Sequence, residues 1–407
     1  MTSREIDSPY AWFRLAISIL LSALGSVGMW SVVVALPAVQ AEFGAARGDA
    51  SLPFTLTTIG FGLGGVIMGK VLDRAGIVVP VLFGAVSLGT GYMLVSLAGD
   101  LRQFAVVYGV LIGMFGTAAT FAPLMADISK WFERRRGIAV ALCASGNYIG
   151  GACWPPIVEY LIRAQGWRAA HVWIGVVCLV SMVPLALLLR SPAPVRSATA
   201  PPLPSAQPRA ANLTPATLQV LLSIAGLSCC VAMSMPQVHI VAYCGDLGYG
   251  VANGARMLSL MLGFGIVSRV ASGFIADKLG GMTTLALGSV AQMSALLLYL
   301  FSDGLMALYV ISAMFGLFQG GLVPSYAIII RENYPASETG GRVGIVMMMT
   351  LFGMALGGWL SGVIFDLTGS YRAAFTNGVA WNLVNLAIAL FLLSRGRRQS
   401  VPVAQVA

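Results

Sequence analysis

Twelve long apolar stretches dominate this chain, and they decide what it can fold into. Most exceed 20 residues, and short polar or Gly/Pro-containing breaks separate them. They are residues 14–37, 51–71, 77–98, 103–125, 137–162, 169–189, 215–243, 251–276, 282–301, 304–330, 341–365 and 372–394. A helix needs about 20 apolar residues to cross a bilayer, where its backbone groups must bond internally. The pattern predicts an all-α membrane protein with twelve transmembrane helices.

The charged residues support this prediction. They make up 10% of the chain, whereas soluble domains carry about 25%. The net charge of +9 does not indicate nucleic-acid binding, because the basic residues fall between the apolar stretches and form no stripe with aromatic residues. The six cysteines lie within or directly beside apolar stretches and lack metal-ligand spacing, so we expect neither a metal nor a cofactor.

A proline-rich segment divides the chain near its middle. Residues 191–215 contain seven prolines and almost no large apolar side chain, which is typical of an extended linker. We therefore expect a six-helix bundle over residues 1–190, a cytoplasmic linker over 191–215, and a second bundle with a cytoplasmic tail over 216–407. Two pseudo-symmetric bundles are the predicted architecture.

The basic residues also predict an orientation. Seventeen of the 24 fall in the tails, loops and stretch ends on the side of the N-terminus, six fall in those on the other side, and Arg269 lies deep within a stretch. By the positive-inside rule both termini are cytoplasmic. The expected location is the bacterial inner membrane.

One motif occurs twice, after the second and the eighth stretch. Residues 69–76 and 273–280 both read G-x-x-x-D-[RK]-x-G, with corresponding positions 204 apart. Glycine permits close helix approach, and an acid–base pair at a helix end can latch a neighbouring helix. We interpret these residues as gating elements: Gly69, Asp73, Arg74, Gly273, Asp277 and Lys278.

Two copies of this loop motif in a twelve-helix chain resemble the major facilitator superfamily, over essentially the whole chain. The resemblance implies two parallel halves with the substrate held at the membrane midplane. The first copy departs from the fuller pattern, because no basic residue follows Gly76.

Arg269 is the foremost candidate for substrate binding. It lies deep in the eighth stretch, two helical turns before Asp277, and no Asp or Glu lies comparably deep. A guanidinium keeps its proton and is costly inside hydrocarbon, so it needs an anionic complement. A substrate carboxylate is one complement. The alternative is that Arg269 reaches Asp277 or backbone carbonyls and only ties helices together.

His239 and several other polar residues are further candidates. His239 follows Pro236, which can bend the helix beside a cavity, and it could bind substrate or carry a proton. The remaining predicted substrate-binding residues are Asn147, Tyr148, Trp30 and Tyr326. Trp30 and Tyr326 are weaker candidates, as are Gln319 and Asn382. For each, a hydrogen bond between helices is the alternative. The glycines of the fifth and eleventh stretches indicate close helix packing.

A closer resemblance is to the monocarboxylate transporters and the oxalate/formate antiporters. It rests on Arg269 with Gly273 and Asp277, on His239, and on the segments 131–137 (WFERRRG) and 365–372 (FDLTGSYR). In that group the arginine binds the substrate carboxylate. Animal members also carry an aspartate and a lysine tied to proton coupling, where this chain has Gly265 and the segment 30–32. The exchanger's second cation has no counterpart in 347–354, and one positive charge suits one carboxylate.

The resemblance implies secondary active transport of a small organic anion, a monocarboxylate, by alternating access as a proton symporter. Exchange of one anion for another, and efflux of hydrophobic compounds, are the alternatives. An enzyme is not expected, and no G-x-x-x-x-G-K-[ST] loop for ATP is present. The expected partners are the anion, a proton or counter-anion, and membrane lipid, with no nucleic acid, and the expected state is a monomer.

Overall fold

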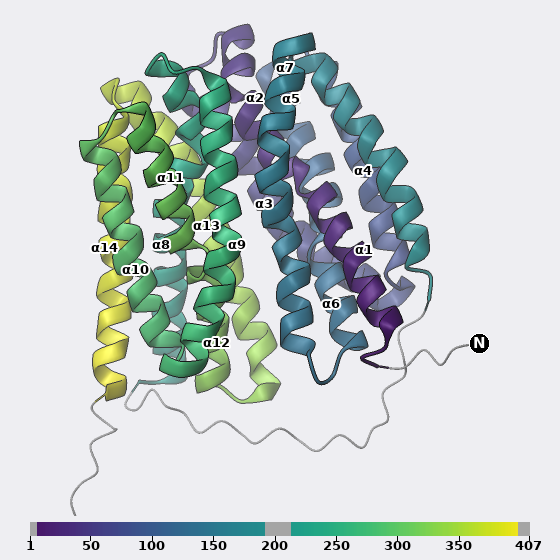
Figure 1. The fold of residues 1–407 in the computed structure, drawn as a ribbon, viewed down its shortest axis with the longest axis vertical. Helices are drawn as coiled ribbons and strands as arrows, with labels where there is room; N and C mark the ends of the chain where they lie inside the picture. Colours follow the sequence, from purple (N-terminus) through teal and green to yellow (C-terminus); the bar gives the residue numbers. More distant parts are fainter. Residues whose placement is uncertain (1–5, 192–212, 398–407) are drawn as a thin grey trace, which may run out of the picture. The chain divides into compact units, whose positions relative to one another are not determined.

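The computed structural model describes residues 6–191 and 213–397, and within them it is helical and contains no β-strand (Figure 1). The described residues form two compact units. The first unit contains residues up to 191 together with Val238–Gly263 and Gly358–Gly369, and the second contains 213–237, Phe264–Gly357 and 370–397. The predicted linker 191–215 and the tail beyond residue 397 lie almost entirely outside the described residues.

The first nine elements belong to the first unit. They are α1 (Pro9–Gly25), α2 (Val27–Phe43), α3 (Arg47–Ala75), α4 (Val78–Ser96), α5 (Leu101–Val107), the π-helix η1 (Tyr108–Gly116), the 3₁₀ turn η2 (Thr117–Thr120), α6 (Ala122–Trp131) and α7 (Arg136–Leu188). Both α1 and α4 pack along α7.

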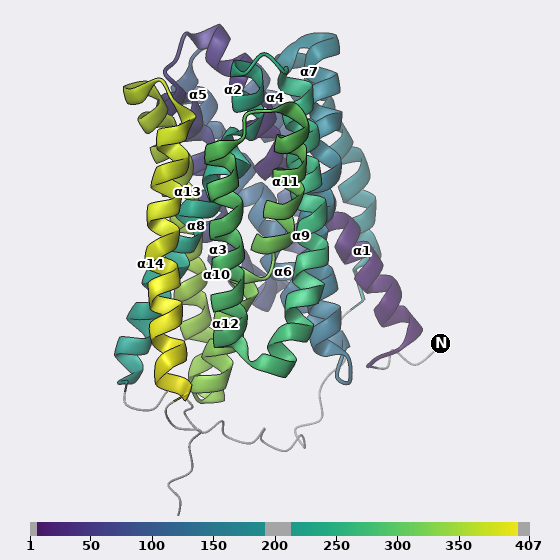
Figure 2. The same cartoon turned by 60° about the vertical axis from the view of Figure 1, so that its left-hand side comes forward.

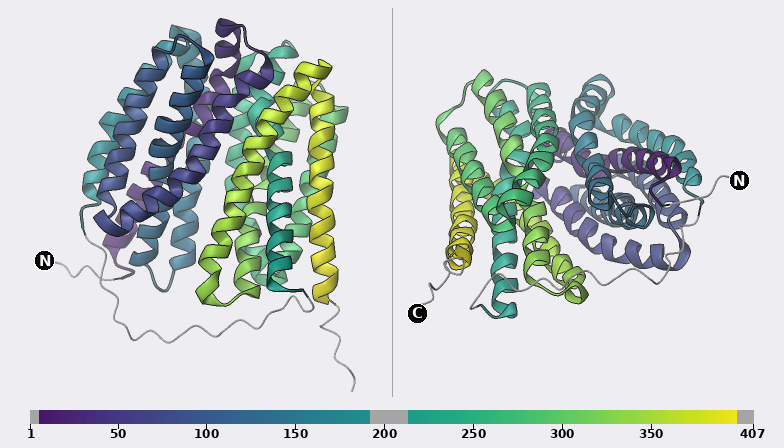
Figure 3. Two further views of the ribbon diagram at one scale, coloured as in Figure 1. Left: turned by 180° about the vertical axis from the view of Figure 1, so that it is seen from behind. Right: turned by 60° about the horizontal axis from the view of Figure 1, so that its bottom comes forward.

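The other elements are α8 (Pro215–Asp246), α9 (Val251–Leu279), α10 (Gly281–Phe301), α11 (Leu305–Gln319), α12 (Leu322–Asn333), α13 (Ala336–Thr368) and α14 (Tyr371–Arg397). The ends of α8 and α13 and the start of α9 belong to the first unit. In the second unit α10 packs against α11, α12 and α14, and Figure 2 shows α14 in yellow alongside α10. Figure 3 shows α14 running as one continuous helix.

Eleven helices among the described residues are long and apolar enough to cross a membrane, whereas the sequence predicts twelve. The difference lies in α7, whose 53 residues contain both the fifth and the sixth apolar stretch. At Gly166 the backbone has φ 80° and ψ 161°, which is not helical and which residues with a Cβ rarely adopt. In Figure 1 the two arms of α7 meet beside its label at the top.

Glycines bring helices together where the sequence predicts close packing. A Cβ on Gly146 of α7 would lie 2.7 Å from the carbonyl oxygen of Ile19 in α1, and one on Gly150 would overlap the carbonyl of Ala23. In the second unit a Cβ on Gly353 of α13 would overlap the carbonyl of Leu227 in α8. The packing role of these glycines is therefore confirmed.

The fourth apolar stretch is less regular than predicted. Residues 103–125 were expected as one helix, but α5 passes into a π-helix and then a 3₁₀ turn before α6 begins. Glycine has a low preference for the α-helix. Gly113 of η1 also lets α3 approach η1, because a Cβ on Gly113 would lie 2.6 Å from the carbonyl oxygen of Thr57 in α3. The irregular turn therefore coincides with a close backbone contact.

Candidate functional site

Arg269 lies near the middle of α9. The helix runs from Val251 to Leu279, so its midpoint is residue 265, and Arg269 follows by four residues, about 6 Å along the axis. Its side chain is half-buried within the second unit. The structure thus places a permanently charged group close to mid-span, where charge is costly and is found mainly in functional sites.

The break between α11 and α12 packs against α9 beside Arg269. A Cβ on Gly320 would overlap the carbonyl of Gly265 and would lie 2.8 Å from Cβ of Ser268. A Cβ on Gly321 would overlap the side chain of Ser272. Only glycines allow the chain between α11 and α12 to approach α9 this closely, so the packing beside the middle of α9 depends on them.

Gln319, the last residue of α11, pairs with Gln237 of α8. Gln237 Nε2 donates a hydrogen bond to Gln319 Oε1 at 2.9 Å, and both side chains are buried. The sequence indicated Gln319 as a weak cavity candidate. The pairing itself could not be read from the sequence, because the two residues are 82 positions apart.

Trp30, Asn147 and Tyr148 lie on adjacent helices of the first unit. Trp30 of α2 is buried, and a Cβ on Gly151 of α7 would lie 2.8 Å from its Nε1. Asn147 is one helical turn before Gly151, so both face the same side of α7. Tyr148 is also buried, whereas Asn147 is half-buried. The structure therefore places Asn147 on the side of α7 that meets Trp30, with Tyr148 next to it along the helix.

His239 of α8 lies against α13 in the first unit. Its side chain is fully buried, and Nε2 donates to the carbonyl oxygen of Gly358 at 2.8 Å. A Cβ on Gly358 would lie 3.1 Å from Cδ1 of Phe54 in α3. His239 thus bonds to a neighbouring helix, which was the alternative to a substrate role.

Tyr326 of α12 belongs to a buried hydrogen-bonded group in the second unit. Its hydroxyl donates to Asn385 Oδ1 at 2.9 Å, and Asn385 Nδ2 donates to Ser289 Oγ at 2.7 Å. Asn382 Nδ2 donates to the carbonyl oxygen of Ser289 at 2.9 Å. These bonds connect α10, α12 and α14, which is the alternative of a hydrogen bond between helices, and a substrate contact of Tyr326 stays a prediction.

The two copies of the loop motif end in the same backbone geometry. Gly76 has φ 75° and Gly280 has φ 81°, and each amide donates to a carbonyl four residues earlier, at 2.9 and 2.8 Å. With ψ of 175° and 161°, these glycines end α3 and α9 in a positive-φ conformation that residues with a Cβ rarely adopt.

The first glycines of the motif differ from expectation. A Cβ on Gly69 or Gly273 would meet no atom within 4 Å in its own unit, so neither allows a close helix contact there. The side chains of Asp73, Arg74, Asp277 and Lys278 are exposed, and no ion pair involves them within the described residues. A gating role for these residues stays a prediction.

An ionic cluster that the sequence did not predict lies at the start of α3. The carboxylate of Asp366 accepts hydrogen bonds from the backbone nitrogens of Arg47 and Gly48, at 2.8 and 2.7 Å. The Arg47 guanidinium pairs with Asp246 at 3.1 Å and lies 5.0 Å from the ring centre of Phe365. The sequence showed these charges near helix ends, but nothing in it signals their pairing.

A buried polar chain crosses the first unit. Tyr92 OH lies 2.6 Å from Ser31 Oγ, which lies 3.0 Å from Tyr108 OH. Tyr108 OH is 2.8 Å from Nε2 of His171, whose Nδ1 is 2.6 Å from the carbonyl oxygen of Trp167. No spacing in the sequence could have revealed this chain, because its members come from α2, α4, η1 and α7.

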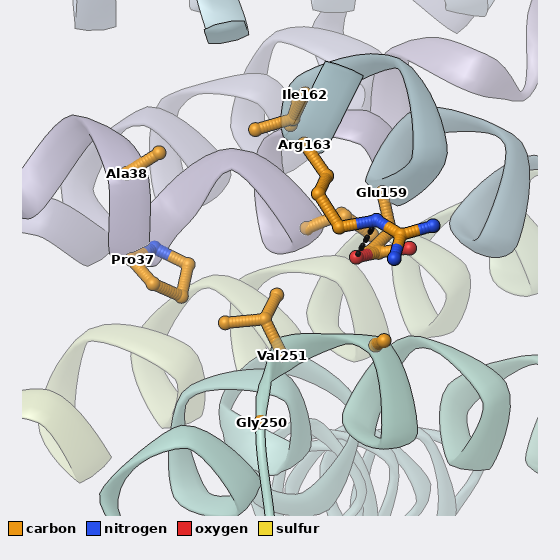
Figure 4. Close-up of a pocket in the computed structure, with 9 residues that line it drawn as sticks. Pro37, Ala38, Glu159, Ile162, Arg163, Gly250 and Val251 are labelled. Carbon is orange, nitrogen blue, oxygen red and sulfur yellow. Dashed lines mark ion pairs between the residues drawn. The ribbon is translucent and has the colours of Figure 1, made fainter.

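The structure also contains a pocket of about 520 Å³ at the ends of α2 and the first arm of α7 and at the start of α9, all within the first unit (Figure 4). Its walls are mostly apolar, and Glu159 and Arg163 form a loose ion pair of 3.7 Å along one of them. The predicted substrate-binding residues are not among those that line it. The pocket is therefore a feature that the sequence did not predict.

The residues described form no group of His, Cys, Asp and Glu suited to hold a metal ion.

Comparison with known proteins gives the family. The Major Facilitator Superfamily model matches residues 18–305 and 284–406. This chain belongs to the major facilitator superfamily. It is an integral, multi-pass membrane transporter and not an enzyme.

Two relatives and one solved structure illustrate the similarity. Monocarboxylate transporter 13 of Rattus norvegicus is 28% identical over 345 residues, covering 84% of this chain and 78% of the relative. Monocarboxylate transporter 11 of Mus musculus is 27% identical over 391 residues, covering 91% and 84%. A bacterial homolog of the human lysosomal transporter Spinster has a TM-score of 0.73 at 12% identity, covering 96% of this chain and 98% of that one. The last comparison supports the fold alone.

Proposed function

We propose that this transporter carries a small organic anion, a monocarboxylate, by alternating access with proton coupling. The observation that carries the proposal is Arg269, a fixed positive charge about 6 Å from the middle of α9. A carboxylate can pair with a guanidinium through two parallel hydrogen bonds, and this neutralisation lowers the cost of the charge at mid-membrane. The similarity to relatives named monocarboxylate transporters supports the same substrate class.

The proposal includes a topology of twelve spans, with α7 counted as two. A straight helix of 53 residues would be about 80 Å long, far beyond the roughly 30 Å hydrocarbon core. The break at Gly166 supplies the reversal between two spans. We further propose the predicted bundles as the two moving halves and both termini as cytoplasmic. Because the relatives named above come from mammals, the bacterial inner membrane stays a prediction.

The decisive experiment compares Arg269→Ala, Arg269→Lys and wild type in proteoliposomes with labelled carboxylic acids. We expect Arg269→Ala to abolish uptake and Arg269→Lys to retain a small fraction, because lysine keeps the charge but loses the planar fork. Arg256→Ala is the matched control, since Arg256 is an exposed arginine on the same helix. Full uptake by Arg269→Ala would overturn the anion-site assignment.

Two alternatives remain within transport. Exchange of anions would give uptake that depends on an anion loaded inside the vesicle and not on a proton gradient. Efflux of hydrophobic cations is favoured by one observation, the Glu159 carboxylate, which is 13% exposed in a mostly apolar pocket. Wild-type uptake that does not change with pH would contradict proton coupling and, with it, the proposed proton role of His239.

A further inference from the structure

Gln237 and Gln319 form a buried amide pair that uses only part of its hydrogen-bonding capacity. Gln237 is 2% exposed and Gln319 is 0% exposed, and one hydrogen bond of 2.9 Å joins them. The other polar atoms, Gln237 Oε1 and Gln319 Nε2, are buried and have no hydrogen-bond partner among the described residues. One acceptor and one donor therefore remain available.

The groups left over are the same whichever way the two amides are oriented. Oxygen and nitrogen of a glutamine amide are assigned from the hydrogen bonds they make. If both amides are turned, Gln319 donates to Gln237, and again one carbonyl and one amino group are left over. If only one is turned, two like atoms face each other, which no hydrogen bond permits. Every allowed assignment leaves one donor and one acceptor.

The pair lies at the depth where a transported molecule must pass. The apolar span Leu305–Asn333 contains α11 and α12, and Gln319 is its central residue. The hydrocarbon core provides no water for polar groups, so such groups are kept where they line a cavity or meet a ligand.

The pair is also close to the proposed anion site. Gly320 follows Gln319 directly and packs against Gly265 and Ser268 of α9, and Arg269 is the next residue after Ser268. Gln319 and Arg269 are thus the sequence neighbours of two residues, Gly320 and Ser268, that contact each other within the second unit. A small acid held at Arg269 would have its other polar group near this contact.

We propose that Gln237 and Gln319 form a specificity subsite that binds a hydroxyl group of the transported acid. The inference rests on the proposed function, in which Arg269 binds the carboxylate. A hydroxyl oxygen both donates and accepts, so it can donate to the free amide oxygen and accept from the free amino group. A keto oxygen only accepts and a methylene does neither, so keto and unsubstituted acids leave one or both atoms unpaired.

The test uses sets of acids that differ only at the second polar group. The probes are lactate, pyruvate and propionate, and, for a larger body, mandelate, phenylglyoxylate and phenylacetate. Binding to the purified full-length protein is measured by calorimetry and by thermal shift. We expect the hydroxy acid of each set to bind about tenfold more tightly than its two analogues, because unpaired buried groups penalise the analogues.

Variants then assign the preference to the pair. In Gln319→Leu and, separately, Gln237→Leu, the ratio between hydroxy and unsubstituted acid should fall below about twofold, with little change for the unsubstituted acid. Gln292→Leu is the matched control. Gln292 is a fully buried amide of α10 that bonds to the carbonyl of Cys229, and it should keep the wild-type ratio.

The outcomes separate this inference from the proposed function. Equal wild-type affinity within each set would overturn the hydroxyl subsite and leave the anion site intact. A preference that survives both leucine variants would overturn the assignment to these residues. If one variant fails to fold, the other variant and the wild-type ratio still decide. Absence of binding by every acid would instead overturn the proposed function itself, and this inference with it.

Discussion

The carboxylate of Asp366 caps the first turn of α3 at Arg47, although the two residues are 319 positions apart. Asp366 Oδ1 accepts from the backbone nitrogen of Arg47 at 2.8 Å, and Oδ2 accepts from that of Gly48 at 2.7 Å. A helix begins with four amide groups that lack an intrahelical partner, and one residue of α13 satisfies two of them. Its negative charge also suits the positive end of the helix dipole.

We predict that Asp366→Ala lowers the free energy of unfolding by about 1 kcal/mol, because this is the usual cost of removing a helix cap. Asp366→Asn should keep about half of the stabilisation, since its one side-chain oxygen can still accept a hydrogen bond from one backbone amide. Thermal unfolding of the purified protein in detergent measures both. Asp73→Ala, at an exposed position near the other end of α3, should change nothing. A melting temperature equal to wild type in Asp366→Ala would contradict the capping role.

A second ion pair is buried in the first unit. Arg14 Nε donates to Asp127 Oδ2 at 2.8 Å, and their side chains are 1% and 5% exposed. The guanidinium also donates to the carbonyl oxygen of Ser191 at 3.1 Å and lies 4.6 Å from the ring centre of Trp131. Arg14 thus joins α1 to α6 and to Ser191, which follows α7.

Removing one partner of this pair should be strongly destabilising. Asp127→Asn leaves the buried Arg14 charge without a counter-ion, and we expect a loss of about 3–5 kcal/mol in unfolding free energy. The double variant Arg14→Met with Asp127→Leu should recover most of that loss, because no unpaired charge remains. The control pair is Arg342 and Glu338, which are 23% and 51% exposed. Glu338→Gln should cost less than about 1 kcal/mol. Equal losses in the two pairs would contradict the prediction.

The features that the sequence predicted depend on local pattern. The apolar stretches place every described span, and the break between residues 162 and 169 contains Gly166, where α7 reverses. The terminal glycines of the repeated motif become the caps at Gly76 and Gly280. Length, hydrophobicity and a positive φ are properties of short segments, so one sequence is sufficient to predict them.

The site could be predicted only in part, because its contacts join distant segments. Arg269 stands out since a charge within an apolar stretch is visible in the sequence. The bond between Gln237 and Gln319 and the cap of Asp366 on α3 depend on which helices pack together. The irregular turn at η1 was also missed, because hydrophobicity does not distinguish a π-helix from an α-helix.

Two glycines of α3 have opposite surroundings, which gives a matched test of packing. A Cβ on Gly64 would overlap the carbonyl of Met114, whereas a Cβ on Gly69 would meet nothing within 4 Å in its unit. We expect Gly64→Ala to lower the melting temperature and the folded yield, because backbone must move to admit the methyl group. Gly69→Ala should be neutral or stabilise by up to about 1 kcal/mol, since alanine is the better helix former. Similar effects of both variants would contradict the packing difference.

The polar chain through Tyr108 offers a last test, because its hydrogen bonds have one consistent direction. His171 Nδ1 lies 2.6 Å from the carbonyl oxygen of Trp167, which can only accept, so Nδ1 carries the proton and Nε2 of the neutral ring accepts. Tyr108 OH must then donate to Nε2, at 2.8 Å, and its oxygen is left to accept from Ser31. The Tyr108 hydroxyl is therefore the link between His171, to which it donates a hydrogen bond, and Ser31, from which it accepts one.

Tyr108→Phe removes that link while keeping the ring. We expect it to lower the free energy of unfolding by about 1–3 kcal/mol, because Nε2 of His171 stays buried without a donor. Tyr160→Phe is the control, since Tyr160 is 60% exposed and should change stability by less than about 0.5 kcal/mol. Denaturant unfolding of both variants measures the difference. If Tyr108→Phe were as stable as Tyr160→Phe, the hydroxyl would not be needed to satisfy His171, and the direction assigned to the chain would be wrong.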